Sequence, residues 1–433
     1  GSPAIGNRGR VYVISQQGNL YCFDPETGGV VWDFSPEESW DNLKDDEDFQ
    51  IDYYTRILSD DFAVISPSPA IGKDNTIYFG WLDGNLYAVN PETGEEKWRF
   101  NKNTGPILAS PVISSNDVIY FGDLDGGFHA ILDQGDKAKR HGKIYQAGPV
   151  AARAAIDGNG NVYFGDLSQD GVLHCLAPDC TLKWKKETFY QLWRSPVIDR
   201  DNNAIFASDD QQVWNFDPAT KTLEALLQIP GGSWPQSISP TLARDGSIFL
   251  GCTNDSFFAL SREGDTLWGF MPLNAEGEPA GITFSSSAIL GDGRVFFGTE
   301  SGTLFMVQTG ITLDFDAPWP SYGQGLRNTG RSGASLNEIR ETLENVNVEE
   351  EIPEDKTPLR FLDVTMQADT GPRLQISGAP NQKFVVEKSD DLNVWQVVGG
   401  VEQCNAEGKG EYAVEHFDAT PGRQRFYRLI KVQ

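Results

Sequence analysis

One stretch decides the fold: residues 68–100 read SPAIGKDNTIYFGWLDGNLYAVNPETGEEKWRF. Four short runs rich in β-branched and aromatic residues are separated there by turn-forming residues, among them Asp83-Gly84 and Pro91-Glu92-Thr93-Gly94. Asp-Gly pairs tolerate the positive φ angles of tight hairpin turns, and such runs between turn signals are typical of antiparallel strands. The stretch therefore predicts one sheet of four short strands.

The same pattern recurs along the first 313 residues. Residues 2–34 repeat it with SPAI at 2–5, GNLY at 18–21 and PETG at 25–28. The residue expected to end the second strand recurs in seven copies, at Ile14, Gly80, Gly122, Gly165, Ala207, Gly251 and Gly298. Four strands per unit, repeated roughly every 42 to 47 residues after the first copy, indicate propeller blades. We predict an all-β fold, a seven-bladed β-propeller over residues 1–333, with eight blades as the alternative if another precedes Gly1.

Residues 35–65 interrupt the repeat between the first two units. This insertion is rich in Asp and Glu and also contains Trp40, Tyr53 and Tyr54. Long loops on a regular scaffold are either solvated excursions or functional segments, so we consider both an acidic solvated loop and a lid or docking surface. The acidic run 45–48 lacks the alternating ligands and the glycine of a calcium loop.

The repeat ends before residue 334. Residues 335–338, SLNE, form a capping box that predicts a short helix, and the acidic stretch 349–355 predicts a linker, so residues 334–357 separate two domains. Residues 358–433 contain six alternating runs and predict a small β-sandwich. They are similar to fibronectin-III-like or immunoglobulin-like modules through residues 385–389, Trp395 and residues 426–429.

The repeat SPAI, IYFG, DGNLYAV, PETGEEKWRF resembles that of quinoprotein-like propellers, the PQQ-like repeat proteins, over residues 2–313. Residues 319–323 (WPSYG) and 328–331 (NTGR) resemble a segment that often accompanies such propellers. The resemblance implies the fold but leaves the function open. Family members include alcohol and sugar dehydrogenases that bind pyrroloquinoline quinone, and non-catalytic scaffolds such as the lipoprotein of the outer-membrane protein assembly machine.

The charge balance excludes one class of partner. With 35 Lys and Arg against 62 Asp and Glu, the formal charge of -27 repels phosphate backbones and argues against nucleic acid. No apolar stretch reaches the 18 residues of a membrane-spanning helix. We expect a monomer in the periplasm or outside the cell, with the signal segment not included in this sequence.

A quinone dehydrogenase needs an aromatic platform for the cofactor, oxygen ligands for calcium and a carboxylate base. The tryptophans that recur on the fourth strand, Trp32, Trp98, Trp184 and Trp268, are interpreted as structural packing residues, since a cofactor site should break the repeat. The four histidines are scattered, so we predict no metal site and no catalytic residues. No cofactor is expected; pyrroloquinoline quinone with calcium is the alternative.

Non-repeating residues before the first strand of a blade should converge at the channel mouth. These candidate ligand-binding residues are Arg153, Tyr190, Trp193, Arg194, Trp234, Gln236 and Phe284. Aromatics interleaved with arginine suit sugar stacking or peptide anchoring, and the alternative is that they plug a narrow axis. Cys175 and Cys180 flank a turn and are a candidate disulfide, although Cys175 also occupies a position where a small buried residue suffices.

Together these patterns favour a non-catalytic binding or assembly scaffold of the cell envelope or exterior, which binds protein or polysaccharide through the propeller face. The alternative is a quinoprotein-type dehydrogenase or other enzyme with its site at the propeller axis. A third interpretation is a sensor or cell-surface module that spaces other domains. Propellers host many unrelated activities, so the repeat itself does not decide among them.

Overall fold

The structure is a computed structural model, and it falls into two compact units. Unit 1 comprises residues 1–209, 215–223 and 317–339, and unit 2 comprises residues 210–214, 224–316 and 340–433. The residues that the structure describes are 2–38, 43, 67–188, 190–208, 212–228, 239–252, 256–274, 279–280, 286–290, 293–299, 303–309, 311–314, 316–324, 328–332, 360–367, 371–377, 383–389, 396–403, 409–413 and 426–432.

Unit 1 contains the first four blades, each an antiparallel sheet whose strands follow in chain order. Blade 1 has β1 (Ala4–Ile5), β2 (Val11–Ile14), β3 (Leu20–Phe23) and β4 (Val30–Phe34), with a short 3-10 turn, η1 (Asn7–Gly9). Blade 2 has β5 (Ala70–Ile71), β6 (Ile77–Gly80), β7 (Leu86–Val89) and β8 (Glu96–Phe100). Blade 3 has β9 (Val112–Ile113), β10 (Val118–Gly122), β11 (Gly127–Asp133) and β12 (Ala138–Arg140), and β13 (Tyr145–Gln146) also pairs with β11. Blade 4 has β14 (Ala155–Ile156), β15 (Val162–Gly165), β16 (Val172–Leu176) and β17 (Leu182–Glu187).

Three further sheets continue the repeat. Blade 5 has β18 (Val197–Ile198), β19 (Ala204–Ser208), β20 (Gln212–Asp217) and β21 (Thr222–Gln228). Blade 6 has β22 (Thr241–Leu242), β23 (Ile248–Cys252), β24 (Ser256–Leu260) and β25 (Thr266–Phe270). Blade 7 has three strands among the described residues, β26 (Ala288–Ile289), β27 (Arg294–Gly298) and β28 (Leu304–Gln308). The predicted all-β propeller of seven blades is confirmed; blade 7 differs from the predicted quartet in the described residues.

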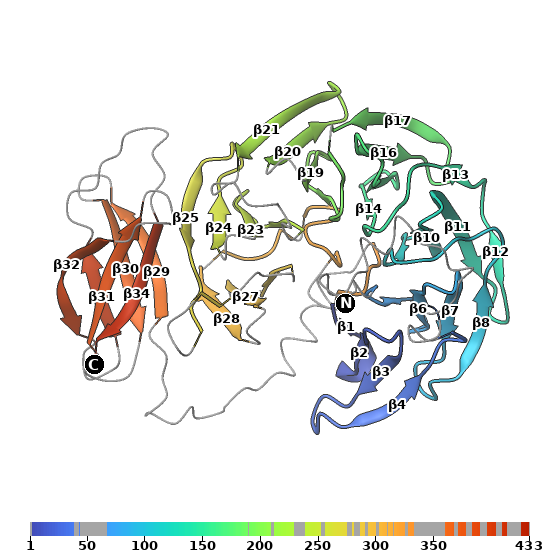
Figure 1. The fold of residues 1–433 in the computed structure, drawn as a ribbon, viewed down its shortest axis with the longest axis horizontal. Coiled ribbons are helices and arrows are strands. Elements are labelled where there is room, and N and C mark those ends of the chain that lie inside the picture. Colours follow the sequence, from blue (N-terminus) through green and yellow to red (C-terminus); the bar gives the residue numbers. More distant parts are fainter. Residues whose placement is uncertain are drawn as a thin grey trace. The chain divides into compact units, whose positions relative to one another are not determined.

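The core lies between neighbouring sheets. In unit 1 the first strand of each blade lies inside and the last lies on the outer rim (Figure 1). Every residue of β6 and β7 is buried, because a blade with a neighbour on each side buries both faces of its strands. Tyr78 and Trp98 of blade 2 belong to one apolar cluster with Phe121 of blade 3. Burial between blades thus explains why the runs are continuously apolar.

Glycine recurs at the end of the second strand because the next segment passes too close for a side chain. A Cβ on Gly80 would lie 2.1 Å from Ile107, one on Gly122 would lie 2.4 Å from Val150, and one on Gly165 would lie 2.2 Å from Leu192. Each contact is with an apolar residue that leads toward the next blade. The recurrent glycine is therefore a packing requirement between blades.

Replacing Gly122 with Ala should lower the free energy of unfolding by about 1 to 3 kcal/mol, because the new methyl group overpacks against Val150. Denaturant titration measures this change. Gly29→Ala is the matched control, because its Cβ would meet the Thr27 hydroxyl at 3.3 Å, and it should change stability by under about 1 kcal/mol. Equal stability of the two variants would contradict the packing explanation.

The C-terminal region forms two three-stranded antiparallel sheets. Their orders are β29-β30-β33 and β32-β31-β34. The strands are β29 (Arg360–Gln367), β30 (Gly371–Ser377), β31 (Lys383–Ser389), β32 (Gln396–Gln403), β33 (Lys409–Ala413) and β34 (Phe426–Val432). All six predicted runs therefore contain strands, while the fibronectin-III-like or immunoglobulin-like sandwich stays a prediction. The helix and linker predicted for residues 334–357 lie outside the described residues.

Candidate functional site

The inner edges of blades 2, 3 and 5 are occupied by residues 317–324 and 328–332 of the same chain, here named the axial segment. The Ile71 N–H in β5 donates to the Thr329 carbonyl oxygen at 2.9 Å, and the Ile113 N–H in β9 donates to the Gly330 carbonyl oxygen at 2.7 Å. Ile198 in β18 forms an antiparallel bridge with Trp319. The first strands of three blades thus have backbone partners on both edges, which leaves these groups satisfied within the chain.

Arg153 fastens the axial segment to two blades. Its side chain is 1% exposed and lies just before β14, at the repeat position that serine holds in blades 2 and 3. Nη2 donates to the Pro69 carbonyl oxygen at 3.1 Å, Nε donates to the Pro111 carbonyl oxygen at 3.4 Å, and Nη1 donates to Asn328 Oδ1 at 3.0 Å. Burial lowers the pKa of the Arg153 guanidinium, and these oxygen atoms compensate for its lost hydration.

Tyr322 of the axial segment lies beside the Arg153 guanidinium. The carbon at the centre of the guanidinium is 4.9 Å from the ring centroid, a cation–π distance. The Tyr322 hydroxyl bonds to Ser68 Oγ at 3.3 Å and to Ser110 Oγ at 2.8 Å. These serines are equivalent residues of the SPAI motif, so one phenol joins the inner ends of blades 2 and 3.

The structure shows Arg153 in a buried site, and ligand binding by this residue stays a prediction. A ligand at the channel mouth requires an accessible guanidinium, whereas this one is buried and bound to the chain's own oxygen atoms. The break in the repeat is real, because arginine replaces serine, but the group that it meets is Asn328, far along the same chain. The plugged axis considered as the alternative describes Arg153 better.

A second recurring feature is a side-chain hydrogen bond between an aspartate after the second strand and a ring on the third strand. Asp123 Oδ2 lies 2.7 Å from His129 Nε2 in blade 3, and Asp166 Oδ2 lies 2.9 Å from His174 Nε2 in blade 4. In blade 2 the Tyr87 hydroxyl, at the position of His129, bonds to Asp83, which stands two positions later in its blade than Asp123 does. All of these rings are buried. The pairs therefore connect the second and third strands of each blade and do not face a ligand.

The neighbours of His129 fix the position of its proton. Arg140 Nη1 lies 3.0 Å from His129 Nδ1, and a guanidinium can only donate, so Nδ1 accepts and Nε2–H donates to Asp123. Burial would raise the pKa of Asp166, but its hydrogen bonds with His174 and Ser168 outweigh burial and hold that pKa below its usual value. Asp166 therefore acts as a charged acceptor in the core of blade 4.

The connection between β17 and β18 carries three of the predicted ligand-binding residues. Tyr190 is 48% exposed, and Trp193 and Arg194 are half-buried. The Trp193 indole N–H donates to Gln191 Oε1 at 3.2 Å, and its ring packs against the apolar cluster that includes Leu167. This loop exposes aromatic side chains that are held in place by packing against the protein, as aromatic residues that bind proteins or sugars are.

The remaining candidates, Trp234, Gln236 and Phe284, lie outside the described residues. Most of the insertion 35–65 does so as well. Its described residues are Ser35–Glu38 and Leu43; the Glu38 carbonyl oxygen accepts the Trp81 indole N–H at 2.9 Å, and Leu43 is buried in the same cluster as Leu167. The choice between a solvated loop and a docking surface therefore stays open for this insertion.

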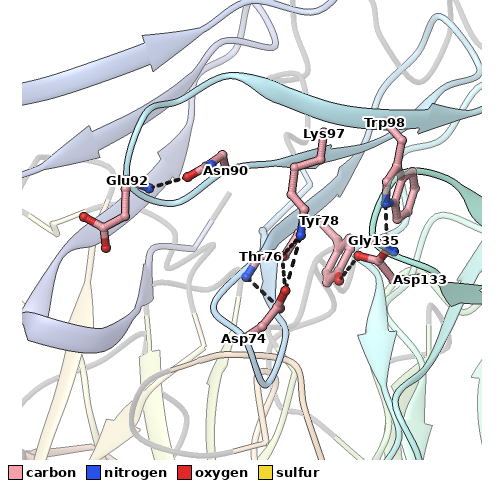
Figure 2. A network of polar contacts seen from close by, with 9 residues as sticks. All are labelled: Asp74, Thr76, Tyr78, Asn90, Glu92, Lys97, Trp98, Asp133 and Gly135. Atoms are coloured by element: carbon pink, nitrogen blue, oxygen red, sulfur yellow. Dashed lines mark hydrogen bonds and ion pairs between the residues drawn. The ribbon is translucent and has the colours of Figure 1, made fainter.

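The recurrent tryptophans of blades 1 and 2 donate to the neighbouring blade. Trp32 Nε1 donates to the Pro91 carbonyl oxygen at 3.0 Å, and Trp98 Nε1 donates to Asp133 Oδ1 at 2.9 Å. Figure 2 shows that Asp133 also accepts the Tyr78 hydroxyl, at 2.7 Å. Each of these two indoles thus makes a ring contact within its own blade and a hydrogen bond to the next blade.

The other two recurrent tryptophans make ring contacts inside their own unit. The Trp184 centroid lies 4.3 Å from that of Phe216, and the Trp268 centroid lies 5.6 Å from that of Phe249. All four indoles have such contacts within the fold. Their assignment as packing residues stays a prediction that substitution can test.

Cys175 and Cys180 are separate buried thiols, so the candidate disulfide is absent. Cys175 pairs with Trp184 across β16 and β17, whereas Cys180 adopts a left-handed turn conformation with φ of 64°. Burial raises the pKa of each thiol to about 12, which disfavours the reactive thiolate. Cys175 is therefore the small buried residue of the alternative interpretation.

Within the described residues, no group of three or more His, Cys, Asp or Glu side chains is placed to hold a metal ion. Nor do the described helical residues include a segment long and apolar enough to cross a membrane. A quinone with calcium needs oxygen ligands and an open aromatic platform near the axis. The inner edges of blades 2, 3 and 5, which the axial segment occupies, do not fit that requirement.

Comparisons with known proteins agree with this fold. A curated protein from Xanthomonas campestris pv. campestris, outer membrane protein assembly factor BamB, is 29% identical over 97 residues. The aligned stretch is 22% of this chain and 20% of that protein, so the match spans about a fifth of the relative's length. The crystal structure of BamB from Moraxella catarrhalis has a TM-score of 0.50 at 15% identity, covering 72% of this chain and 84% of that chain, and shows likeness of fold alone.

A family model covers more of the chain than that curated relative does. It matches residues 1–224, which include blades 1 to 4, the strands of blade 5 through β20 and the first residues of β21. The matched range contains the SPAI motifs and three of the recurrent glycines, Gly80, Gly122 and Gly165. Since more than half of the chain matches, this protein belongs to the PQQ-like repeat family described as outer membrane protein assembly factor BamB.

Proposed function

We propose that this chain is a non-catalytic binding scaffold of the cell envelope that holds a protein partner on the propeller face exposing Tyr190 and Trp193. One observation carries the proposal: the axial segment occupies inner strand edges of unit 1, with Arg153 and Tyr322 buried against it. Because the axial segment takes up these inner edges, we place the binding surface on the exposed loops. The likeness to outer membrane protein assembly factors supports assembly as the setting and the periplasm as the location.

The exposed loop has the chemistry of a binding anchor. Tyr190 is nearly half exposed, and Trp193 is half-buried against the apolar cluster. Because this packing already restricts the rotamers of the Trp193 side chain, a partner that binds the two rings loses less conformational entropy. Aromatic anchors of this kind contribute a large share of binding energy at protein interfaces. The same rings could stack on a polysaccharide, so the test includes a polysaccharide fraction as competitor.

The Tyr190→Ala, Trp193→Ala double variant should weaken capture of the envelope partner at least about tenfold, since each anchor contributes more than about 1 kcal/mol. The measurement is crosslinking and pull-down from an envelope extract, followed by titration with the purified partner. Leu182→Ala is the matched control, because Leu182 is 46% exposed but lies on the outer strand β17. Capture that survives in the double variant, or is lost equally in the control, would contradict the proposed face; release by polysaccharide alone would contradict a protein partner.

A further inference from the structure

Lysine side chains gather on the outer strands of blades 3 and 4. They lie at β12, in its connection to β13, and on β17, and no Asp or Glu occurs between Lys137 and Ile156. The acidic residue on β17 is Glu187, at its end. We call these residues the lysine strip: Lys137, Lys139, Lys143, Lys183, Lys185 and Lys186.

The two parts of the strip adjoin in space. A Cβ on Gly142, in the connection from β12 to β13, would lie 2.2 Å from the Asp179 carbonyl oxygen, in the turn before β17. The Tyr145 hydroxyl lies 3.2 Å from His174 Nδ1 in the neighbouring blade. In Figure 1, β12, β13 and β17 follow one another along the outer rim of unit 1. The two groups of lysines therefore lie on neighbouring parts of the outer rim.

Among the described residues, no carboxylate forms an ion pair with a lysine of the strip. Basic residues of blades 1 and 2 do have partners: Arg10 pairs with Glu92 at 3.1 Å and Lys97 pairs with Asp74 at 3.3 Å. In the part of the chain that the structure describes, no strip lysine has a carboxylate within 4.0 Å, and Lys183 bonds to the neutral Asn161 Oδ1 at 2.9 Å. In a chain of charge -27, this cluster of uncompensated ammonium groups is unusual.

Protection of sheet edges does not account for the strip. Lysines on an outer strand hinder pairing with other chains, and every blade has an outer strand that needs such protection. Yet β4 reads VVWDF and β25 reads TLWGF, both without lysine. The concentration on blades 3 and 4 therefore points to a contact specific to that side.

We propose that the lysine strip lies against an anionic lipid surface, with its ammonium groups over the phosphate groups. Flexible lysines act as point charges that suit phosphates spread over a surface, whereas a bound acidic peptide favours arginine forks and aromatic pockets. Lys137, Lys139 and Lys185 are exposed, as such a contact requires. This proposal does not depend on the proposed protein-binding face at Tyr190.

The net charge does not prevent this contact. At an ionic strength of 0.1 M the Debye length is about 10 Å, so a lipid surface senses mainly the charges nearest to it. Repulsion by distant carboxylates slows approach from bulk solution, while the strip supplies the local attraction. The contact should therefore be strongly weakened by salt.

The test is co-sedimentation of the full chain with phosphatidylcholine vesicles that contain phosphatidylglycerol, at low and high salt. Binding should require phosphatidylglycerol and be lost at high salt. The Lys139→Gln, Lys185→Gln double variant should bind about thirtyfold more weakly, because each lysine near an anionic surface contributes about fivefold. The Lys73→Gln, Lys221→Gln variant is the control with the same change of charge on exposed lysines elsewhere, and it should bind like wild type.

Each other outcome overturns the proposal. If wild-type protein binds vesicles equally well with and without phosphatidylglycerol, the proposed lipid contact is wrong. If both double variants bind vesicles equally weakly, the attraction does not come from the lysine strip. Displacement from vesicles by polyglutamate at low concentration, with tight binding of the polymer, would assign the strip to an acidic polypeptide. Thermal unfolding of each variant checks that loss of binding does not come from loss of fold.

Discussion

Replacing Arg153 with Met should lower the free energy of unfolding by about 3 to 5 kcal/mol. The substitution leaves the Pro69 and Pro111 carbonyl oxygens and Asn328 Oδ1 without their donor in a buried site. Each unpaired buried acceptor costs about 1 to 3 kcal/mol. Removing the buried positive charge offsets part of this loss, because the guanidinium no longer has to be desolvated.

Denaturant titration of Arg153→Met beside Arg8→Met provides the measurement. Arg8 is 77% exposed and pairs with Glu92 at 3.6 Å on the surface, so its substitution should change stability by at most about 0.5 kcal/mol. If the two variants unfolded at the same denaturant concentration, the axial segment would not hold the blades as described.

The second large effect is expected for Asp166→Asn, which should destabilise the fold by about 3 kcal/mol. The carboxylate accepts from His174 Nε2 at 2.9 Å, from Ser168 Oγ at 2.6 Å and from the Gly148 N–H at 3.0 Å. An amide nitrogen in place of one carboxylate oxygen would face these donors with a donor of its own. Asp170→Asn, at an exposed residue four positions along, is the control and should leave the unfolding curve unchanged.

The pH dependence of this variant has a defined sign. Because the pKa of Asp166 is held below the ordinary value of 3.8, its contribution to stability is fully present above that value and is lost as pH falls through the folded-state pKa. The difference in unfolding free energy between wild type and Asp166→Asn should be constant near neutral pH and narrow below about pH 4. A difference that is unchanged at acid pH would show that the ionised carboxylate is not the stabilising group.

The strands of the propeller could be predicted because each blade carries its own local signals. Asp83-Gly84 forms a hairpin in which Gly84 has φ of 77°, and Gly80 and Gly122 end second strands where the next segment needs the space of a side chain. Such requirements are repeated with every blade, so comparing the copies shows them. The six C-terminal runs could be placed for the same reason, from alternation between turns.

The site was harder to predict because its contacts join residues far apart in the chain. Arg153 and Asn328 are separated by 175 positions, and no pattern inside one repeat identifies such a partner. The available signal was arginine in the serine position of the SPAI motif, which indicated a special residue but not whether it faces a ligand or the protein. The lysine strip could not be predicted from the overall charge of -27, because a net charge does not show a local excess of positive residues.

The central claim is that the chain itself, through the axial segment, occupies the inner strand edges of blades 2, 3 and 5, so that no quinone binds near the axis. Calorimetric titration of the protein with pyrroloquinoline quinone in the presence of calcium tests it most directly. We predict no saturable heat of binding and no shift in unfolding temperature. Tight stoichiometric binding, with stabilisation of the fold, would contradict the claim and favour a quinoprotein enzyme.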